Sequence, residues 1–365
     1  MFSQDTINYL KQAVEQGRVS RGPVDLQILP TTRCNARCVF CPSHAVSEQA
    51  KAAHAPRWLM PDTDLNIGMM DRLFDDLYRL GGLRRVHITG GEPLLHNKML
   101  AALFILRRNF PGVEISLVTN GILLGKAAES LVRAQINRVS VSVNAGDPQS
   151  FARQAGVKAE NFEKIREGLK LLRKMRGKVS SPLPYLSLTA VLNRENCREA
   201  EKMLQFGIDS GADAVTYLAL MDFPFPGEAA REFALSEAEF DEFVRELERL
   251  KPRAEGAKIF LGFTGKPGDQ GKLRAGNLYQ SVPCYSGYTF VMVWPDGSVR
   301  PCCNCETVLG SLAEQSFYQI WTSKRAQEIR ERMFKIAELG PPELCDCLEC
   351  GYLYENQEFH RRAKK

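Results

Sequence analysis

The chain alternates between short runs of β-branched and other apolar residues and longer stretches in which apolar residues recur every three or four positions. The first pattern indicates buried strands, and the second indicates amphipathic helices. Strands that alternate with helices usually build a parallel sheet covered by those helices. The pattern predicts six such strands, at residues 25–31, 85–89, 114–119, 138–144, 185–192 and 214–220.

The six strand–helix units predict an α/β fold. A closed eight-stranded barrel normally needs about 250 residues, whereas the alternating region spans roughly 200, so a partial (β/α)6 TIM-like barrel fits better than a full one. Such a barrel places its functional groups at the carboxyl ends of its strands.

Outside the barrel the pattern changes. We expect an N-terminal helical segment at residues 1–24, the barrel at 25–221, a connection at 222–257 that ends in the helical stretch SEAEFDEFVRELERL, and a C-terminal domain at 258–365. In the C-terminal domain, two strand-like runs flank Pro295-Asp296-Gly297, which is favourable chemistry for a hairpin turn. A small α+β hairpin-and-helix domain is therefore expected.

Composition and charge narrow the class of protein to which this chain can belong. The 365 residues are 44% hydrophobic and 25% charged, as in an ordinary globular protein, and the net charge of +5 forms no dominant basic block apart from a short C-terminal tail. Nucleic acid is therefore not an expected partner. Because no stretch approaches the roughly 20 apolar residues of a membrane span and the N-terminus does not look like a signal peptide, we expect a cytoplasmic protein with no membrane partner.

Eleven cysteines are present, and ten fall into two groups. Cytoplasmic thiols are normally reduced, so we expect metal or redox chemistry rather than disulfides. The first group, Cys34, Cys38 and Cys41, follows the first strand as CxxxCxxC. Three thiolates leave one iron of a 4Fe-4S cluster open, whereas ferredoxin-type clusters take four. The alternative is a structural zinc site with His44 as a fourth ligand.

This cysteine loop resembles that of the radical SAM (S-adenosylmethionine) superfamily, and the resemblance extends over about residues 25–220. It implies a 4Fe-4S cluster whose open iron binds SAM, and reductive cleavage of SAM to a 5'-deoxyadenosyl radical. Phe40 matches the aromatic residue that lies beside the adenine. The residues that match the GGEP motif, whose groups hold the SAM amine, are Gly90, Gly91, Glu92 and Pro93.

Weaker matches follow later strands. The resemblance implies that Asn120, Ser142 and Asn144 lie near the SAM ribose and that Arg153 pairs with the SAM carboxylate. Turn chemistry, or a solvated helix face for Arg153, explains these residues equally well. His87, inside the second strand, is expected to be a core residue rather than a ligand.

The second cysteine group resembles the twitch and SPASM auxiliary-cluster domains. The resemblance implies a second 4Fe-4S cluster, and the alternative is a structural zinc ribbon. Cys303, Cys305 and Cys345 receive no role, which leaves the number of auxiliary clusters open. The four residues that fit the order of ligands in such a domain are Cys284, Cys302, Cys347 and Cys350.

The resemblance implies an oxidoreductase-type enzyme in which a flavodoxin- or ferredoxin-type protein supplies the electron. The leading hypothesis is the two-electron oxidation, or dehydrogenation, of a small molecule or a carrier-free biosynthetic intermediate. A radical epimerase with a cysteine as hydrogen donor, a peptide-modifying maturase, and a non-catalytic iron-sulfur or zinc scaffold are the alternatives. Neither the substrate nor the acid/base residue nor the oligomeric state follows from the sequence.

Overall fold

The six predicted strands form the centre of a curved, mostly parallel sheet. The computed structural model describes residues 3–41, 62–220, 233–264, 279, 282–343, 345, 347, 350 and 352–364. All six predicted strands are present, and neighbouring strands pair in parallel in sequence order. They are β1 (Asp25–Ile28), β2 (Arg85–Ile88), β3 (Glu114–Thr119), β4 (Arg138–Ser142), β5 (Tyr185–Leu192) and β6 (Ala214–Ala219).

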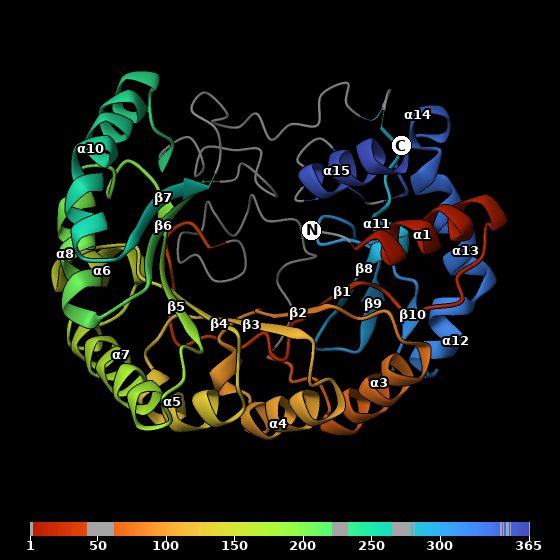
Figure 1. Ribbon diagram of the computed structural model, residues 1–365, viewed down its shortest axis with the longest axis horizontal. Coiled ribbons are helices and arrows are strands. Elements are labelled where there is room, and N and C mark those ends of the chain that lie inside the picture. Colours follow the sequence, from red (N-terminus) through yellow and green to blue (C-terminus); the bar gives the residue numbers. More distant parts are fainter. Residues whose placement is uncertain are drawn as a thin grey trace.

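A layer of helices covers the outer, convex face of this sheet (Figure 1). Alternate residues of each strand, such as Val86 and Ile88, are fully buried in the core beneath these helices, while the residues between them face the concave side. The outer helices are α3 (Ile67–Leu80), α4 (Met99–Asn109), α5 (Leu124–Arg133), α7 (Glu160–Lys178) and α8 (Ala200–Ser210). The sheet does not close on itself, so the partial barrel is confirmed.

Both edges of the sheet extend beyond the six strands. β7 (Phe260–Thr264) pairs in parallel with β6, and β8 (Phe290–Val293) pairs in parallel with β1. The predicted hairpin is confirmed, because β9 (Ser298–Arg300) runs antiparallel to β8 and is followed by β10 (Gly310–Ser311). The C-terminal region thus shares one sheet with the barrel, and in the described part of the chain that sheet has ten strands.

The predicted domain limits remain predictions. The limit between residues 221 and 222, like the FPFPGE stretch, lies outside the described residues. The helix expected in the connection is α10 (Glu237–Gly256), and a capping box formed by Ser236 and Glu239 begins it. The strand β7 then returns to the barrel edge, although its residues lie beyond the predicted limit at 257.

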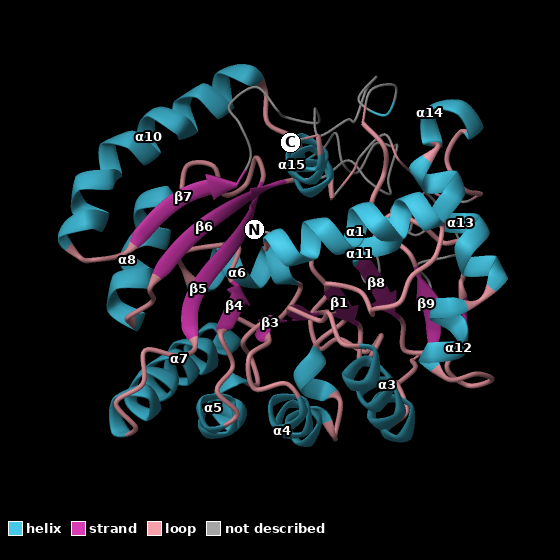
Figure 2. Cartoon of the chain, turned by 45° about the vertical axis from the view of Figure 1, so that its right-hand side comes forward, coloured by secondary structure: helices cyan, strands magenta, loops and turns pink. Residues whose placement is uncertain are grey.

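The remaining helices include two that lie on the other side of the sheet from α3, α4 and α5 (Figure 2). These are α1 (Gln4–Gln16) and α15 (Leu353–Ala363), and an apolar cluster with Leu10, Tyr285 and Phe359 joins them. No helix among the described residues is long and apolar enough to cross a membrane. The others are α6 (Pro148–Ala155), the 3-10 helix η2 (Pro93–Leu95), α11 (Ser286–Thr289), α12 (Phe317–Thr322), α13 (Lys324–Phe334) and α14 (Ile336–Leu339).

Candidate functional site

The first cysteine loop leaves the carboxyl end of β1 and is held by α6. The backbone N–H of Arg37 donates to the carbonyl of Ala155 at 2.8 Å, and that of Val39 donates to Gln154 at 3.0 Å. Cys34, Cys38 and Cys41 are all half-buried in this loop, as is Phe40. The structure therefore brings the three predicted thiols and the predicted adenine neighbour together at the mouth of the barrel.

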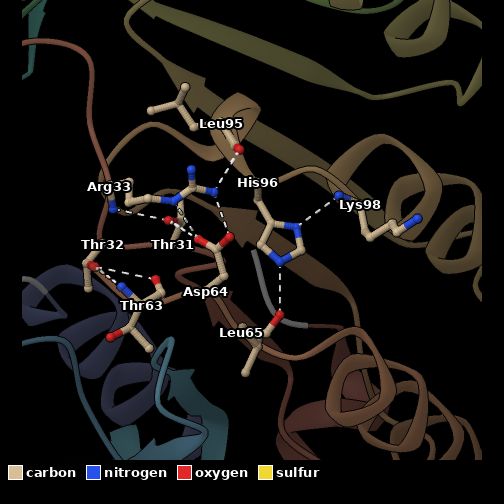
Figure 3. Close-up of polar contacts among 9 residues, drawn as sticks. All are labelled: Thr31, Thr32, Arg33, Thr63, Asp64, Leu65, Leu95, His96 and Lys98. Carbon is tan, nitrogen blue, oxygen red and sulfur yellow. Dashed lines mark hydrogen bonds and ion pairs between the residues drawn. The ribbon is translucent and has the colours of Figure 1, made fainter. Parts of the chain in front are cut away.

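A polar clamp fixes the residue that precedes Cys34 (Figure 3). The Arg33 guanidinium donates to both Asp64 carboxylate oxygens, at 3.0 and 2.6 Å, and to the Leu95 carbonyl at 3.0 Å. Thr31 adds a hydroxyl that donates to Asp64 at 2.5 Å. Burial alone would raise the pKa of Asp64, but the hydrogen bonds from Arg33 and Thr31 outweigh it and lower that pKa. The carboxylate thus stays ionised and holds the loop.

The GGEP turn packs directly against the cysteine loop. The N–H of Gly91 donates to the Thr31 carbonyl at 3.0 Å, and that of Glu92 donates to the Arg33 carbonyl at 2.7 Å. Gly90 has a φ of 131°, which side chains rarely adopt. A Cβ on Gly91 would lie 2.2 Å from the Arg33 carbonyl oxygen. Glycine is therefore required for this approach.

Glu92 is fully buried, and its carboxylate accepts three hydrogen bonds within the protein. The donors are the Thr119 hydroxyl at 2.7 Å and the backbone N–H groups of Asn120 at 2.7 Å and Leu94 at 3.1 Å. Burial raises the pKa of Glu92, against these hydrogen bonds. The described contacts make Glu92 a brace between the GGEP turn and the end of β3.

Asn120 lies beside the cysteine loop. Its side-chain amide donates to Asn35 at 2.7 Å and lies 3.8 Å from the Cys34 sulfur.

The other residues predicted to contact SAM lie further from the cysteine loop in their hydrogen bonding, because their described partners belong to other elements. Asn144 is buried and accepts from the Val191 N–H at 2.9 Å, so it braces β5. Ser142 is half-buried, and Arg153 is exposed on α6 and donates to Ser150 at 3.0 Å.

The three thiols of the first group share a site with little compensating positive charge. Burial raises the pKa of Cys34, and burial followed by the neighbouring sulfurs of Cys41 and Cys34 raises that of Cys38. A group of buried thiols that repel one another as thiolates is stabilised when a metal cluster replaces their protons. The three residues therefore fit a cluster that takes three ligands.

The second cysteine group surrounds one cavity. Its lining includes all four predicted auxiliary ligands, which come from the start of α11, the end of the hairpin and the segment before α15. Two side chains donate toward these sulfurs, since the Tyr279 hydroxyl lies 2.6 Å from Cys350 and the Asn356 amide lies 3.9 Å from Cys284. Hydrogen bonds to sulfur tune the potential of iron-sulfur clusters. The four predicted ligands in this lining are Cys284, Cys302, Cys347 and Cys350.

The three cysteines without a predicted role are Cys303, Cys305 and Cys345, and their sulfurs make other contacts. A hydrogen bond from the Cys303 side chain lowers the pKa of Cys302 to about 7. Cys305 and Cys345 form a disulfide with Cα atoms 4.0 Å apart, so the expectation of no disulfides is wrong for this pair. The physical reason is an isolated antiparallel bridge between the two residues, which brings their backbones together. Among the described residues, no group of three or more His, Cys, Asp or Glu side chains is arranged so that it could hold a single metal ion.

Three residues of the site carried no signal in the sequence. Arg33 and Asp64 meet only through folding, and Asn35 has no motif role.

The prediction that His87 is a core residue is wrong, because its side chain is exposed. The alternation along β2 buries Val86 and Ile88 under the helices and turns His87 to the concave face. The alternation of apolar and polar residues along this strand was the signal in the sequence that could have placed His87 on the concave face.

Comparison with known proteins agrees with this geometry. Residues 28–207 match the radical SAM superfamily, and residues 284–351 match the SPASM iron-sulfur cluster-binding domain. A probable GTP 3',8-cyclase of Sulfurisphaera tokodaii is 30% identical over 244 residues, which are 66% of this chain and 68% of the relative. The GTP 3',8-cyclase of Mycobacterium marinum is 30% identical over 195 residues, 53% of this chain. The match spans about half of that relative, 49% of its length.

Two solved structures share the fold. SuiB of Streptococcus suis bound to S-adenosylmethionine superposes with a TM-score of 0.62 at 16% identity, over 90% of this chain and 72% of SuiB. AdoMet-bound native anSMEcpe gives a TM-score of 0.62 at 16% identity, over 93% of this chain and 97% of that protein. The family match, the relative that aligns over two thirds of its length and the two cysteine sites agree. This chain therefore belongs to the radical SAM superfamily and carries a C-terminal SPASM-type iron-sulfur cluster-binding domain.

Proposed function

We propose that this protein is a radical SAM oxidoreductase that dehydrogenates a small molecule and passes one electron of that oxidation to an auxiliary 4Fe-4S cluster. The observation that carries the proposal is the pairing of β8 with β1. The first cysteine loop follows β1, and Cys302 follows the hairpin that β8 begins. Since β9 runs antiparallel to β8 and Cys284 precedes β8, the second site lies at the amino end of β8, beside the strand whose carboxyl end carries the first cysteine loop. Both sites thus flank the same edge of the barrel, which favours a role for the second site in the same reaction.

In this proposal, each residue group has a separate task. Cys34, Cys38 and Cys41 hold the catalytic cluster, and Cys284 and Cys302 hold the auxiliary one together with Cys347 and Cys350. When bound, the reduced catalytic cluster and SAM supply the 5'-deoxyadenosyl radical that accepts the substrate hydrogen atom. The GGEP backbone, Phe40 and Asn120 orient SAM, while Arg33 and Asp64 keep the cysteine loop in place. A flavodoxin- or ferredoxin-type protein is the proposed reductant.

The described part of the concave face favours a neutral substrate. Arg85 makes a bidentate ion pair with Asp25, at 2.6 and 2.7 Å, which neutralises both groups. On β8, Phe290 and Met292 form an apolar cluster with Tyr352 on the side opposite to the helices. Arg138 of β4 lies on the same side, with its guanidinium over the Tyr185 ring and no ion pair to a described residue. A triphosphate needs several such cations, so this part of the wall supports a hydroxyl-bearing neutral compound over GTP.

The first test is anaerobic reconstitution followed by dithionite and SAM, with 5'-deoxyadenosine, iron, zinc and sulfide all quantified. We expect SAM cleavage with roughly eight irons per chain, and loss of about four in a Cys34/Cys38/Cys41→Ala variant. Cys197→Ala is the matched control, because Cys197 is buried in the apolar core, its thiol donates to the Arg194 carbonyl, and it lines neither cysteine site. Bound zinc with no SAM cleavage would sink the proposal and favour a scaffold.

The second test separates oxidation from the activities that the relatives' names suggest. Holoenzyme is incubated with neutral polyols, with GTP and with serine- and cysteine-containing peptides, and products are identified by mass spectrometry. Loss of two hydrogen atoms from a polyol supports dehydrogenation. A cyclised GTP product or a modified peptide would instead place the protein with the cyclases or with the peptide-modifying enzymes that share its fold.

A further inference from the structure

One imidazole lies on the concave face just below the mouth of the barrel. His87 is the next-to-last residue of β2, three positions before Gly90 of the GGEP turn. Strand register sets it between Gln27 of β1 and Ser116 of β3. Its side chain is exposed, although it stands on a central strand of the sheet. The imidazole is therefore accessible to a molecule bound on this face.

A hydrogen bond to Ser116 positions this imidazole. His87 Nδ1 lies 2.8 Å from the Ser116 hydroxyl oxygen, and that hydroxyl donates in turn to the Val86 carbonyl at 3.4 Å. When the Ser116 hydroxyl proton is directed to the Val86 carbonyl, Ser116 accepts from Nδ1–H. Nε2 then carries the lone pair, and within the described residues it makes no hydrogen bond. The geometry presents a proton acceptor to the concave space.

The surroundings keep this acceptor neutral. The pKa of His87 is lowered, because the surrounding walls of the curved sheet withdraw the imidazole from bulk water even though part of its side chain is exposed. No charged neighbour opposes that effect, because the nearest acidic groups are paired or lie further down the strands. The charged and titratable groups on the concave side of the adjoining elements are Asp25, Arg85, Glu114, Arg138, Tyr352 and Glu355.

We infer that His87 is the general base of the reaction, with Ser116 as its positioning residue, and that the substrate carries a secondary alcohol. The inference rests on the proposed oxidation. The carbinol carbon loses its hydrogen atom to the SAM-derived radical, Nε2 accepts the hydroxyl proton, and the remaining electron goes to the auxiliary iron-sulfur cluster. The C–O single bond becomes a C=O double bond, so one hydrogen atom, one proton and one electron are accounted for.

The accessibility of Nε2 is tested first, without any substrate. Wild-type holoenzyme is treated with diethyl pyrocarbonate between pH 5 and 8, and modified histidines are mapped by mass spectrometry. We expect His87 to react at a pH where free histidine, with a pKa of about 6.5, is mostly protonated. His96 is the internal control, because it is buried and its Nε2 and Nδ1 contact the Leu65 carbonyl and the Lys98 N–H. An unreactive His87 overturns the inference.

The closing experiment separates hydrogen abstraction from proton removal. Holoenzyme with His87→Gln is compared with wild type, on the alcohol that wild type oxidises, for 5'-deoxyadenosine, deuterium transfer from the carbinol carbon and ketone. We expect deuterium transfer to persist while ketone formation falls about 100-fold and loses its pH dependence. Added imidazole should restore ketone formation in His87→Gly. Wild-type ketone rates in His87→Gln, or an equal loss of deuterium transfer and ketone, overturn the inference alone. Absence of ketone in wild type contradicts the proposed oxidation itself.

Discussion

At the scale of single residues, a close contact between two backbone segments determines how the cysteine loop and the GGEP turn fit together. The cysteine loop and the GGEP turn touch at Gly91, where a Cβ would lie 2.2 Å from the Arg33 carbonyl oxygen. That oxygen also accepts the Glu92 N–H, so it cannot move without breaking this bond. The distance between the two motifs is therefore set by the lack of a side chain.

Gly91→Ala tests this approach. We expect the added methyl group to displace the cysteine loop, to lower the free energy of unfolding by about 1–3 kcal/mol and to reduce cluster retention. Thermal unfolding and iron content measure the two effects. Gly112→Ala is the matched control, since a Cβ there has no heavy atom within 4 Å and the backbone has no positive φ. Equal effects at both positions would contradict the argument.

The two histidines near the GGEP motif show what residue-level reading misses. His87 and His96 stand nine positions apart, and no sequence motif assigns a role to either. In the structure, His96 is buried and bonded to the Leu65 carbonyl, whereas His87 is exposed on the concave face. His96 follows the short helix η2 and is buried, whereas His87 lies on the concave face of β2, and this difference in position separates a structural imidazole from a proposed base.

At the scale of elements, α6 holds the cysteine loop through backbone hydrogen bonds. Asp147 caps this helix, because its carboxylate accepts the N–H groups of Gln149 at 3.1 Å and Ser150 at 2.9 Å. Pro148 at the first helical position adds a fixed φ. At the other end, the carbonyls of Gln154 and Ala155 accept the loop N–H groups. A weakened cap therefore loosens the loop.

Asp147→Ala is expected to cost about 1 kcal/mol of stability at neutral pH, while Asp147→Asn, which can still accept both bonds, costs less. The Ser150 N–H and the Lys202 ammonium lower the pKa of Asp147. The unfolded chain thus binds this proton more readily, so the contribution is present above the ordinary pKa of about 3.9 and is lost as pH falls through the lowered folded value. Urea unfolding at pH 7 and pH 3 measures it. An alanine penalty that is unchanged at pH 3 would refute this account.

At the scale of the whole molecule, one network joins residues at opposite ends of the chain. The Tyr352 hydroxyl donates to the Asp25 carboxylate, which also pairs with Arg85. Tyr352 lies two residues after Cys350, and its ring packs on Phe290 of β8 with centroids 5.0 Å apart. The auxiliary segment is therefore tied to the first strand of the barrel.

Removing this link in Tyr352→Phe leaves a buried carboxylate with one fewer donor. We expect a loss of about 1–3 kcal/mol in unfolding free energy and faster release of the auxiliary iron to a chelator, with SAM cleavage retained. Tyr354→Phe serves as the control, because Tyr354 is 48% exposed. Chelation rates that match in the two variants would show that the link does not reach the auxiliary site.

The sequence by itself determined the α/β class, the six parallel strands, the hairpin and the family, because periodicity and closely spaced motifs are local properties. CxxxCxxC and GGEP placed their residues at adjacent strand ends without any knowledge of contacts. Only the tertiary structure decided that β8 extends the barrel sheet beside β1, that Arg33 meets Asp64 and that Cys305 pairs with Cys345. These features depend on strand order and on contacts between distant segments, which no local pattern of hydrophobic and polar residues encodes.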